Sequence, residues 1–259
     1  MTSRRATLQM AVAAALAPRA VLAQPAPVIA AASDLADALP LVIAAYQKRT
    51  GKTVRVLYGP SAGFARQIQG GETRFEVFMA SDEAYVDQLQ KAGLTANSGA
   101  LYGIGRLCLF VPKASKVRLD ARLRDLAAAA EDGRLQKLAL FTTNGPYGRA
   151  SRDALTQAKV WMPLQPKVAL VETSTQMAQV VTSGGVQAAL LPLSIAVVPK
   201  VQGAGTYVLV PETAHKPMRQ RAVVLKGASA GAEMFYRFLR DPEARAILKT
   251  HGFRLPGGR

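Results

Sequence analysis

Short apolar runs alternate with longer stretches of helical periodicity along most of this chain. Apolar runs of about four to eight residues are typical of buried strands, whereas apolar residues spaced three and four apart indicate helices. We expect strands at Val28–Ala32, Thr53–Tyr58, Val77–Ala80, Leu107–Val111, Leu138–Phe141, Val168–Val171, Ala188–Leu191, Tyr207–Val210 and Ala222–Leu225. We expect helices at Leu41–Arg49, Gly63–Gln69, Glu83–Ala92, Leu123–Ala130, Arg149–Ala158, Gln176–Thr182, Ala232–Leu239 and Pro242–Thr250. This alternation predicts an α/β architecture.

The length leaves room for two domains. The chain has 259 residues, of which 49% are hydrophobic and 19% are charged, an ordinary balance for a globular protein. This length suits one large domain or two of about 100–130 residues each. No linker is evident, so two lobes would have to be joined by strands that pass between them. The single cysteine, Cys108, excludes an intramolecular disulfide and is expected to be a buried thiol on a strand.

The N-terminus has the pattern of an export signal. Arg4 and Arg5 precede an apolar stretch, and small residues ending at Ala23 precede Gln24. A charged region, a short apolar region and a small-residue cleavage site define a signal peptide, here residues 1–23. The arginine pair resembles a twin-arginine signal, and general secretion stays open. We expect an exported bacterial protein that is cleaved after Ala23.

The strong positive charge raises the question of nucleic-acid binding. The formal net charge is +16 and the isoelectric point is about 10.4. The basic residues are nevertheless spread along the chain, only 6% of residues are aromatic, and no nucleic-acid-binding motif is present. We interpret the charge as a solvated cationic surface that speeds encounter with an anionic ligand, and we expect no nucleic-acid partner.

Small or hydroxyl-bearing residues recur where an apolar strand gives way to a helix. The junctions are Ala31–Leu35, Gly59–Gly63, Gly145–Gly148 and Glu172–Gln176. Each helix start leaves up to four backbone N–H groups without intrahelical partners, and the helix dipole adds partial positive charge. Taken singly, a hydroxyl at such a position is better explained as a helix cap. However, Ala62, Gly63 and Gly148 would also let a ligand approach the backbone, so junctions that converge would form an anion site.

The sequence offers little for enzyme chemistry. With only His215 and His251 and no second cysteine, the usual Cys/His metal site is not expected. The Gly103–Gly105 segment lacks the third glycine and the helix of a dinucleotide fingerprint. We interpret His215 as a surface-loop residue and His251 as a helix-end residue. No enzymatic activity, cofactor or bare metal cation is therefore expected.

In their order and spacing, the segments resemble the periplasmic molybdate-binding proteins of ABC importers. The resemblance runs from Val28 to about Phe253. It is carried by Ala31–Leu35, Tyr58–Ile68, Phe75–Asp82, Pro146–Gly148, Glu172–Val181, Leu209–Pro211, Pro217–Gln220 and His251–Phe253. It implies the two-lobed periplasmic-binding-protein architecture, with the ligand in the cleft between two α/β lobes. The implied first lobe comprises residues 24–105 and 212–259, and the second comprises residues 106–211.

The resemblance also implies a set of ligand-binding residues. Ser33 and Ser61 would donate hydroxyl and backbone N–H bonds from the first lobe, and Ala62 would add a backbone N–H. Tyr147 and Thr175 would contribute backbone N–H groups from the second lobe. The ligand would be a tetrahedral oxyanion, molybdate or tungstate, bound through its oxygens by a monomer in the periplasm and passed to the membrane permease of an ABC importer.

Some positions depart from the family pattern and leave other ligands open. Pro60 replaces a serine and removes one donor, and Pro192 stands where some members have a ligand tyrosine. The alternatives are a binder of sulfate, phosphate or a small carboxylate with the same fold, or a sensor without transport.

Two residues after the first strand need an explanation. Pro40 would kink a helix that began at Ser33, so either the first turn is separate or the regular helix begins near Leu39. Asp34 would repel a dianion. We expect its side chain to turn away from the site into a structural role, and the alternative is that it accepts a proton from an anion such as phosphate.

Overall fold

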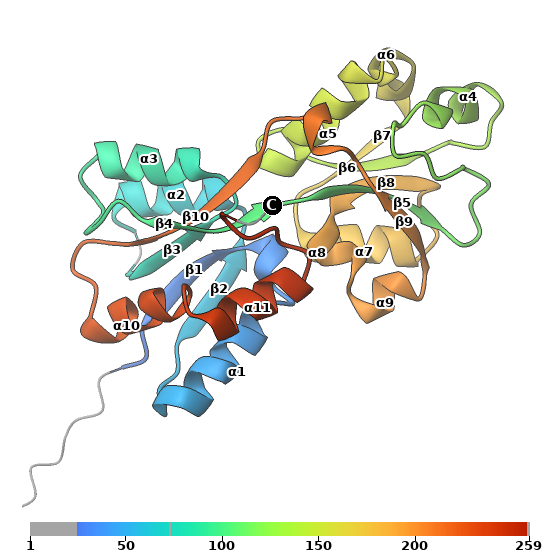
Figure 1. The fold of residues 1–259 in the computed structure, drawn as a ribbon. Coiled ribbons are helices and arrows are strands. Elements are labelled where there is room, and N and C mark those ends of the chain that lie inside the picture. The colour runs from blue at the N-terminus through green and yellow to red at the C-terminus, as the bar shows by residue number, and fades with distance from the viewer. Residues whose placement is uncertain (1–24, 73, 258–259) are drawn as a thin grey trace, which may run out of the picture.

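The computed structural model describes residues 25–72 and 74–257, and the expected signal peptide, residues 1–23, lies outside the described residues. Two five-stranded sheets lie side by side, each with helices on its faces (Figure 1). The first sheet has the order β2-β1-β3-β10-β4, and the second has the order β7-β6-β8-β5-β9. The expected two-lobed α/β architecture is therefore confirmed.

The strands of the first sheet are β1 (Val28–Ala32), β2 (Arg55–Gly59), β3 (Val77–Ala80), β4 (Ala100–Gly105) and β10 (Met218–Val224). Those of the second are β5 (Leu107–Pro112), β6 (Leu138–Phe141), β7 (Val168–Val171), β8 (Ala188–Pro192) and β9 (Gly205–Leu209). In the first sheet, β1 runs parallel to β2 and β3, whereas β10 runs antiparallel to β3 and β4. In the second, β6 runs parallel to β7 and β8, and β5 antiparallel to β8 and β9.

The helices that accompany the first sheet are α1 (Leu39–Thr50), α2 (Ser61–Gly70), α3 (Glu83–Lys91), α10 (Ala230–Phe238) and α11 (Pro242–Thr250). Those of the second are α4 (Asp125–Glu131), α5 (Pro146–Gln157), α6 (Trp161–Leu164), α7 (Ser174–Thr182), α8 (Leu193–Ala196) and α9 (Pro199–Gln202). Short 3-10 turns are η1 (Ser33–Leu35), η2 (Gln165–Lys167) and η3 (Glu212–Ala214). None of the helices in the described part of the chain has the length and apolar character to span a bilayer.

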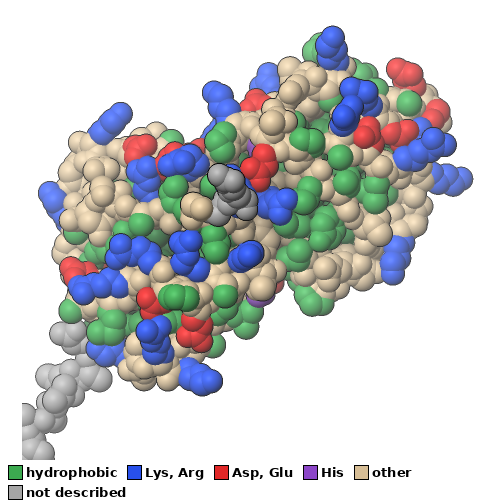
Figure 2. Space-filling view, viewed as in Figure 1, with side chains coloured by type: hydrophobic (Ala, Val, Ile, Leu, Met, Phe, Trp, Pro, Cys, Tyr) green, Lys and Arg blue, Asp and Glu red, His purple; other side chains and the backbone are tan. Residues whose placement is uncertain are grey.

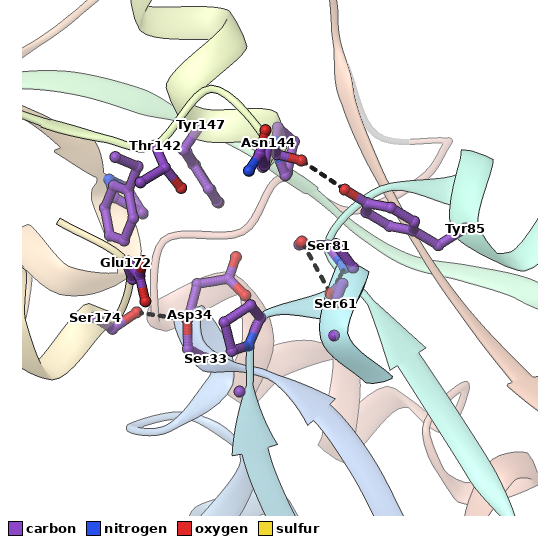
Figure 3. Close-up of a pocket in the computed structure, with 18 of the residues that line it drawn as sticks. Ser33, Asp34, Ser61, Ser81, Tyr85, Thr142, Asn144, Tyr147, Glu172 and Ser174 are labelled. Carbon is purple, nitrogen blue, oxygen red and sulfur yellow. Dashed lines mark hydrogen bonds between the residues drawn. The ribbon is translucent and has the colours of Figure 1, made fainter. Parts of the chain in front are cut away.

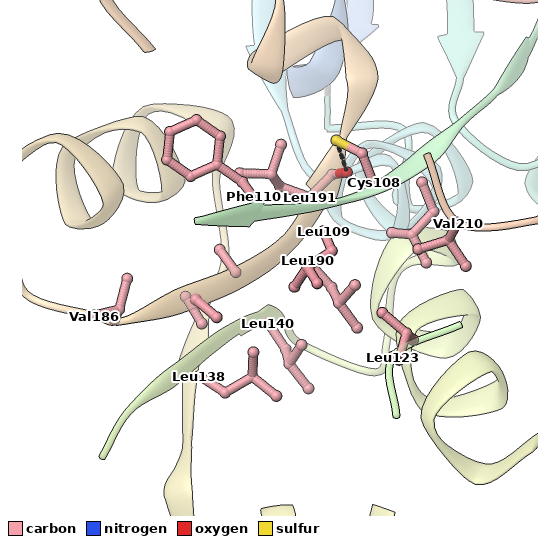
Figure 4. Close-up of a cluster of buried hydrophobic side chains, with 14 of the residues drawn as sticks. Cys108, Leu109, Phe110, Leu123, Leu138, Leu140, Val186, Leu190, Leu191 and Val210 are labelled. Carbon is pink, nitrogen blue, oxygen red and sulfur yellow. Dashed lines mark hydrogen bonds between the residues drawn. The ribbon is translucent and has the colours of Figure 1, made fainter. Parts of the chain in front are cut away.

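Side chains that point alternately to the two faces of the first sheet form two core layers, one on each face. In β3, Val77 and Met79 pack with α1, α10 and α11, whereas Phe78 and Ala80 pack with α2 and α3. Successive side chains of a strand point to opposite faces, so a strand that is apolar throughout is covered on both. The second sheet contributes to one continuous core, in which Cys108 is buried as expected and its Sγ donates to the Leu191 carbonyl at 3.3 Å (Figure 4).

The chain passes between the sheets twice. Only Arg106 separates β4 from β5, and residues 210–217 connect β9 to β10. We therefore propose the lobe limits inferred from the sequence, residues 24–105 with 212–259 and residues 106–211. The question raised by Pro40 is answered by a separate turn, η1, followed by α1, which begins at Leu39 with Pro40 in its first turn.

Candidate anion-binding site

A cavity of about 220 Å³ lies between the two sheets, where strand ends and helix N-termini from both sides meet (Figure 3). From the first side it is lined by Ser33, Asp34, Gly59, Pro60, Ser61, Ala62, Gly63, Arg66, Ser81 and Tyr85. From the second it is lined by Phe141, Thr142, Asn144, Gly145, Pro146, Tyr147, Glu172, Ser174 and Pro192. Because liquid water takes about 30 Å³ per molecule, this space suits a small ion with a few waters.

Ser61 is held in the cavity wall by a neighbouring strand end. It is the first residue of α2, it is buried, and its Oγ accepts the backbone N–H of Ser81 at 3.0 Å. The two hydroxyl oxygens are 3.1 Å apart. Since the Ser61 oxygen already accepts from a backbone N–H, its own hydrogen is free to be donated, either to Ser81 or to an anion in the cavity.

Ser33 follows β1 directly and faces the second lobe. The Ser174 hydroxyl donates to Ser33 Oγ at 3.3 Å, a hydrogen bond that crosses the cleft (Figure 3). The N-cap residues of η1 and α2 are Ala32 and Pro60, and neither makes a side-chain cap hydrogen bond. Helix capping, the simpler explanation for hydroxyls at these junctions, therefore does not account for Ser33 or Ser61.

The start of α2 presents backbone donors to the cavity. The N–H groups of Gly63 and Phe64 both bond the carbonyl of Pro60. Those of Ser61 and Ala62 occupy the first two helical positions, where no intrahelical acceptor exists. Together with the helix dipole, they give this wall partial positive charge without a charged side chain.

The start of α7, which has a capping box, also has free backbone N–H groups. Thr173 Oγ1 accepts the Gln176 N–H at 3.2 Å, and the Gln176 side chain accepts the Thr173 N–H. Because Gln176 is the third helical residue, the N–H groups of Ser174 and Thr175 are left without an intrahelical acceptor. Ser174 lines the cavity, whereas Thr175 is exposed and does not.

Tyr147 joins the cavity from the first turn of α5. Its side chain is buried, and its hydroxyl accepts Gln220 Nε2 at 3.1 Å. A Cβ at position 105 would lie 2.4 Å from the Tyr147 hydroxyl, so glycine at Gly105 makes room for this ring. Of the five residues inferred from the sequence, Ser33, Ser61, Ala62 and Tyr147 line one cavity, and Thr175 lies next to it.

Asp34 also lines the cavity, and the expectation that it turns away from the site is wrong. It is only 5% exposed, and its Oδ2 accepts Gln220 Nε2 at 2.7 Å. Gln220 is in turn fixed by Tyr102, whose hydroxyl donates to Gln220 Oε1 at 2.7 Å. Asp34 Oδ1 is buried and has no hydrogen-bond partner among the described residues. Burial raises the pKa of Asp34, and hydrogen bonds with Gln220 and Tyr147 oppose that rise.

Direct contacts hold the two sides together at the rim of the cavity. Arg149 of α5 forms an ion pair with Asp82, the N-cap residue of α3, and also donates to the Asn144 carbonyl at 3.1 Å. The Tyr85 hydroxyl of α3 donates to that same carbonyl at 2.7 Å. With the Ser174–Ser33 bond, these contacts describe a cleft that is closed.

Two further expectations need correction. A Cβ at Gly148 would lie 2.1 Å from the Thr142 carbonyl oxygen, so this glycine serves the packing of α5 against the preceding loop rather than ligand approach. His215 is buried and not at the surface, with Nδ1 2.8 Å from the Lys216 carbonyl oxygen. Pro192 lines the cavity without a hydroxyl or N–H.

The set of ligand-binding residues implied in the sequence analysis omitted several cavity residues. Ser81, Asn144, Glu172 and Ser174 all line the wall. Each stands in the first few residues after a strand, which is also where Ser33 and Ser61 lie. Within the described residues no cluster of three or more His, Cys, Asp or Glu side chains is placed to hold a metal ion.

The chain is similar to known binding proteins over most of its length. The family model described as bacterial extracellular solute-binding protein matches residues 27–254. The molybdate-binding protein ModA of Azotobacter vinelandii is 30% identical over 88% of this chain and 89% of that protein. ModA of Rhodobacter capsulatus is 30% identical over 87% of each. The structure of the Azotobacter vinelandii periplasmic molybdate-binding protein superposes with a TM-score of 0.79 at 24% identity, covering 89% of this chain and 99% of that one.

These matches show the family. The chain belongs to the bacterial extracellular solute-binding proteins, and it is a binding protein rather than an enzyme.

Proposed function

We propose that this extracellular solute-binding protein captures molybdate, or tungstate, in the inter-lobe cavity and passes it to the membrane permease of an ABC importer. The observation that carries the proposal is the convergence of hydroxyls and helix N-termini on one small cavity, in a chain that is 30% identical to molybdate-binding proteins over nearly nine-tenths of its length. The assigned donors are Ser33, Ser61, Ala62 and Tyr147, with Thr175 as the fifth contact.

The cavity is suited to an anion that carries its charge on several oxygens. Hydroxyls and free backbone N–H groups surround the space, and they stabilise negative charge without a buried cation. The side chain of Arg66 lies at the exposed edge of the lining. Figure 2 shows Lys and Arg scattered over both halves of the visible face rather than gathered in a stripe, which suits attraction of a small anion better than tracking along a nucleic acid.

Export to the periplasm completes the proposal. A twin-arginine or general signal over residues 1–23 would be removed after Ala23, and the mature protein would act as a monomer. N-terminal sequencing of the exported protein tests this step, with Gln24 as the expected first residue. Recovery of only the intact chain from the cytoplasm would contradict it.

Titration calorimetry of the mature protein tests the ligand. Molybdate is expected to bind at one site per chain, and tungstate is expected to compete for it. Sulfate and phosphate serve as tetrahedral comparison anions. Binding of one of these, with no heat from molybdate or tungstate, would support the alternative anion-binding function and contradict the proposed one.

A further inference from the structure

We infer that the cavity binds its anion together with one proton, and that the proton is carried by Asp34, whose carboxylic acid form donates a hydrogen bond to an anion oxygen. The inference rests on the proposed function, since it requires an oxyanion in this cavity. It makes Asp34 a ligand-binding residue that couples affinity to pH.

The two oxygens of Asp34 have different environments. Oδ2 receives the Gln220 amide N–H at 2.7 Å, in an orientation that also places Gln220 Oε1 2.7 Å from the Tyr102 hydroxyl, which lies 3.1 Å from the Ala80 carbonyl oxygen as well. Oδ2 is therefore the acceptor, or carbonyl, end of the group. Oδ1 is buried, lacks a partner among the described residues, and belongs to a side chain that lines the cavity. A proton on Asp34 is thus directed to Oδ1, where an anion can accept it.

The groups that face Asp34 are neutral. They are Gln220 from β10, Tyr102 from β4 and Tyr147 from α5, and burial raises the pKa of both tyrosines well above its ordinary value. α8, which packs against η1, contributes only Leu193–Ala196 and so no titratable side chain. Within the described part of the chain, Asp34 has no ion-pair partner.

The charged groups nearby belong to other pairs or to the rim. Asp37, the exposed carboxylate that follows η1, interacts electrostatically with Tyr58 of β2 and with His251 at the end of α11. Arg66 and Glu172 are opposite charges at exposed positions of the cavity lining. None of these supplies Asp34 with the buried positive charge that would keep it ionised beside an anion.

An anion in the cavity therefore favours the acid form. Two negative groups that share a low-dielectric site repel each other, so keeping both ionised is unfavourable in free energy. The pKa of the weaker acid therefore rises. Molybdate is a doubly charged ion at neutral and alkaline pH, so the proton comes from solvent and stays on Asp34. In the net reaction the protein takes up one anion and one proton. The only bond that breaks is the one that held this proton to its donor in solution.

The pH dependence follows from linkage. Below the pKa of Asp34 in the free protein, both states are protonated and affinity does not change with pH. Between the free pKa and the higher pKa of the complex, each unit of pH weakens binding up to about tenfold. Above the pKa of the complex, the anion meets a carboxylate and affinity levels off at its weakest. Burial raises the pKa of Asp34, so the window lies above the range in which an exposed aspartate titrates.

Calorimetry with molybdate in pairs of buffers that differ in ionisation enthalpy tests the inference on the wild-type protein. The observed heat is expected to differ between buffers by their difference in ionisation enthalpy multiplied by the number of protons taken up. That number is expected to reach up to one per anion over a series from about pH 6 to about pH 9. Asp34→Asn is expected to bind with no pH dependence and no proton uptake, because the Asn carbonyl can accept from Gln220 while its NH₂ donates to the anion. Asp37→Asn is the matched control and should retain the wild-type slope.

The outcomes separate the inference from the function beneath it. Molybdate binding whose heat is independent of buffer at every pH would overturn the inference and leave the proposed function standing. So would an Asp34→Asn protein that keeps the wild-type pH slope. A wild-type protein that binds none of the four anions would overturn both. Since the buffer comparison needs no variant, the inference stays testable even if Asp34→Asn fails to fold.

Discussion

Replacing Ser61 with alanine tests the site and the fold at once, because its hydroxyl serves both. In the complex, the hydroxyl hydrogen is available to a charged anion oxygen in a water-poor cavity. A hydrogen bond to a charged group contributes about 1.5–3 kcal/mol. Ser61→Ala is therefore expected to weaken molybdate binding roughly 10- to 150-fold.

The same change leaves the Ser81 N–H without its acceptor. That hydrogen bond, at 3.0 Å, is buried. A buried donor left unpaired costs about 1–3 kcal/mol of unfolding free energy. In a protein of this size, each kcal/mol lowers the melting temperature by about 2–4 °C. Ser33→Ala differs, because Ser33 accepts only the Ser174 hydroxyl, which can turn to water; it should lose affinity and keep its stability.

Calorimetry of the variants, together with thermal melts of the ligand-free proteins, separates the two effects. Ser183→Ala is a matched control at an exposed position at the far end of α7 and should change neither quantity. Pro40→Ala, close to the site but without a proposed donor, should leave affinity intact. If Ser61→Ala melts early yet binds molybdate with wild-type affinity, the hydroxyl only supports the strand end and the assignment of Ser61 as a ligand is refuted.

Three further measurements address closure and packing. Arg149→Met removes the partly exposed ion pair with Asp82, which contributes about 0.2–1 kcal/mol. Because its loss favours the open cleft, molybdate binding should weaken by up to about fivefold in affinity measurements. Arg237→Met on α10 is the control and should not change the affinity. Gly148→Ala forces a Cβ against the preceding loop and should lower the melting temperature and affinity, while Gly63→Ala, which has open space, should melt within a few degrees of wild type. X-ray scattering should give a smaller radius of gyration with molybdate than without it, and an unchanged profile at saturation would contradict closure.

The strands whose bounds the sequence predicted are those formed by uninterrupted apolar runs. β1, β3, β6 and β7 begin and end where their apolar runs do. β4 was not predicted, because Gly103 and Gly105 weaken its strand pattern. The structure gives the reason for both glycines: a Cβ at either position would press against Phe253 or Tyr147. No local pattern contains that requirement.

The polar half of β10 was missed for a related reason. Only its apolar end was expected, yet the strand begins at Met218 and includes Arg219 and Arg221. Both arginines pair with Glu83 of α3, and Arg221 also bonds Asp87. Arginine in a strand next to a helix of opposite charge has the same sequence pattern as arginine in a loop.

The site was predictable to the level of its junctions but not of its bonds. Hydroxyls and small residues after strands indicated the junctions that contain Ser33 and Ser61, and the family resemblance implied that these two serines bind the ligand. The bond from Gln220 to Asp34 joins residues 186 positions apart, and only the folded chain brings them together. The sequence predicted an Asp34 that turns away because a carboxylate repels a dianion, whereas the structure places it in the wall.

The position of β10 within the first sheet determines the order in which the two sheets can form during synthesis. Every strand of the second sheet lies between Leu107 and Leu209. In the first sheet, β4 is joined to the other strands only when β10 pairs with both β3 and β4. A ribosome therefore releases all of the second sheet before the first can close, and the pairings of β10 are long-range contacts that form slowly. The cleft is assembled last. A chain truncated before Met218 would keep the whole second sheet but have no Gln220 to hold Asp34, and so no finished site.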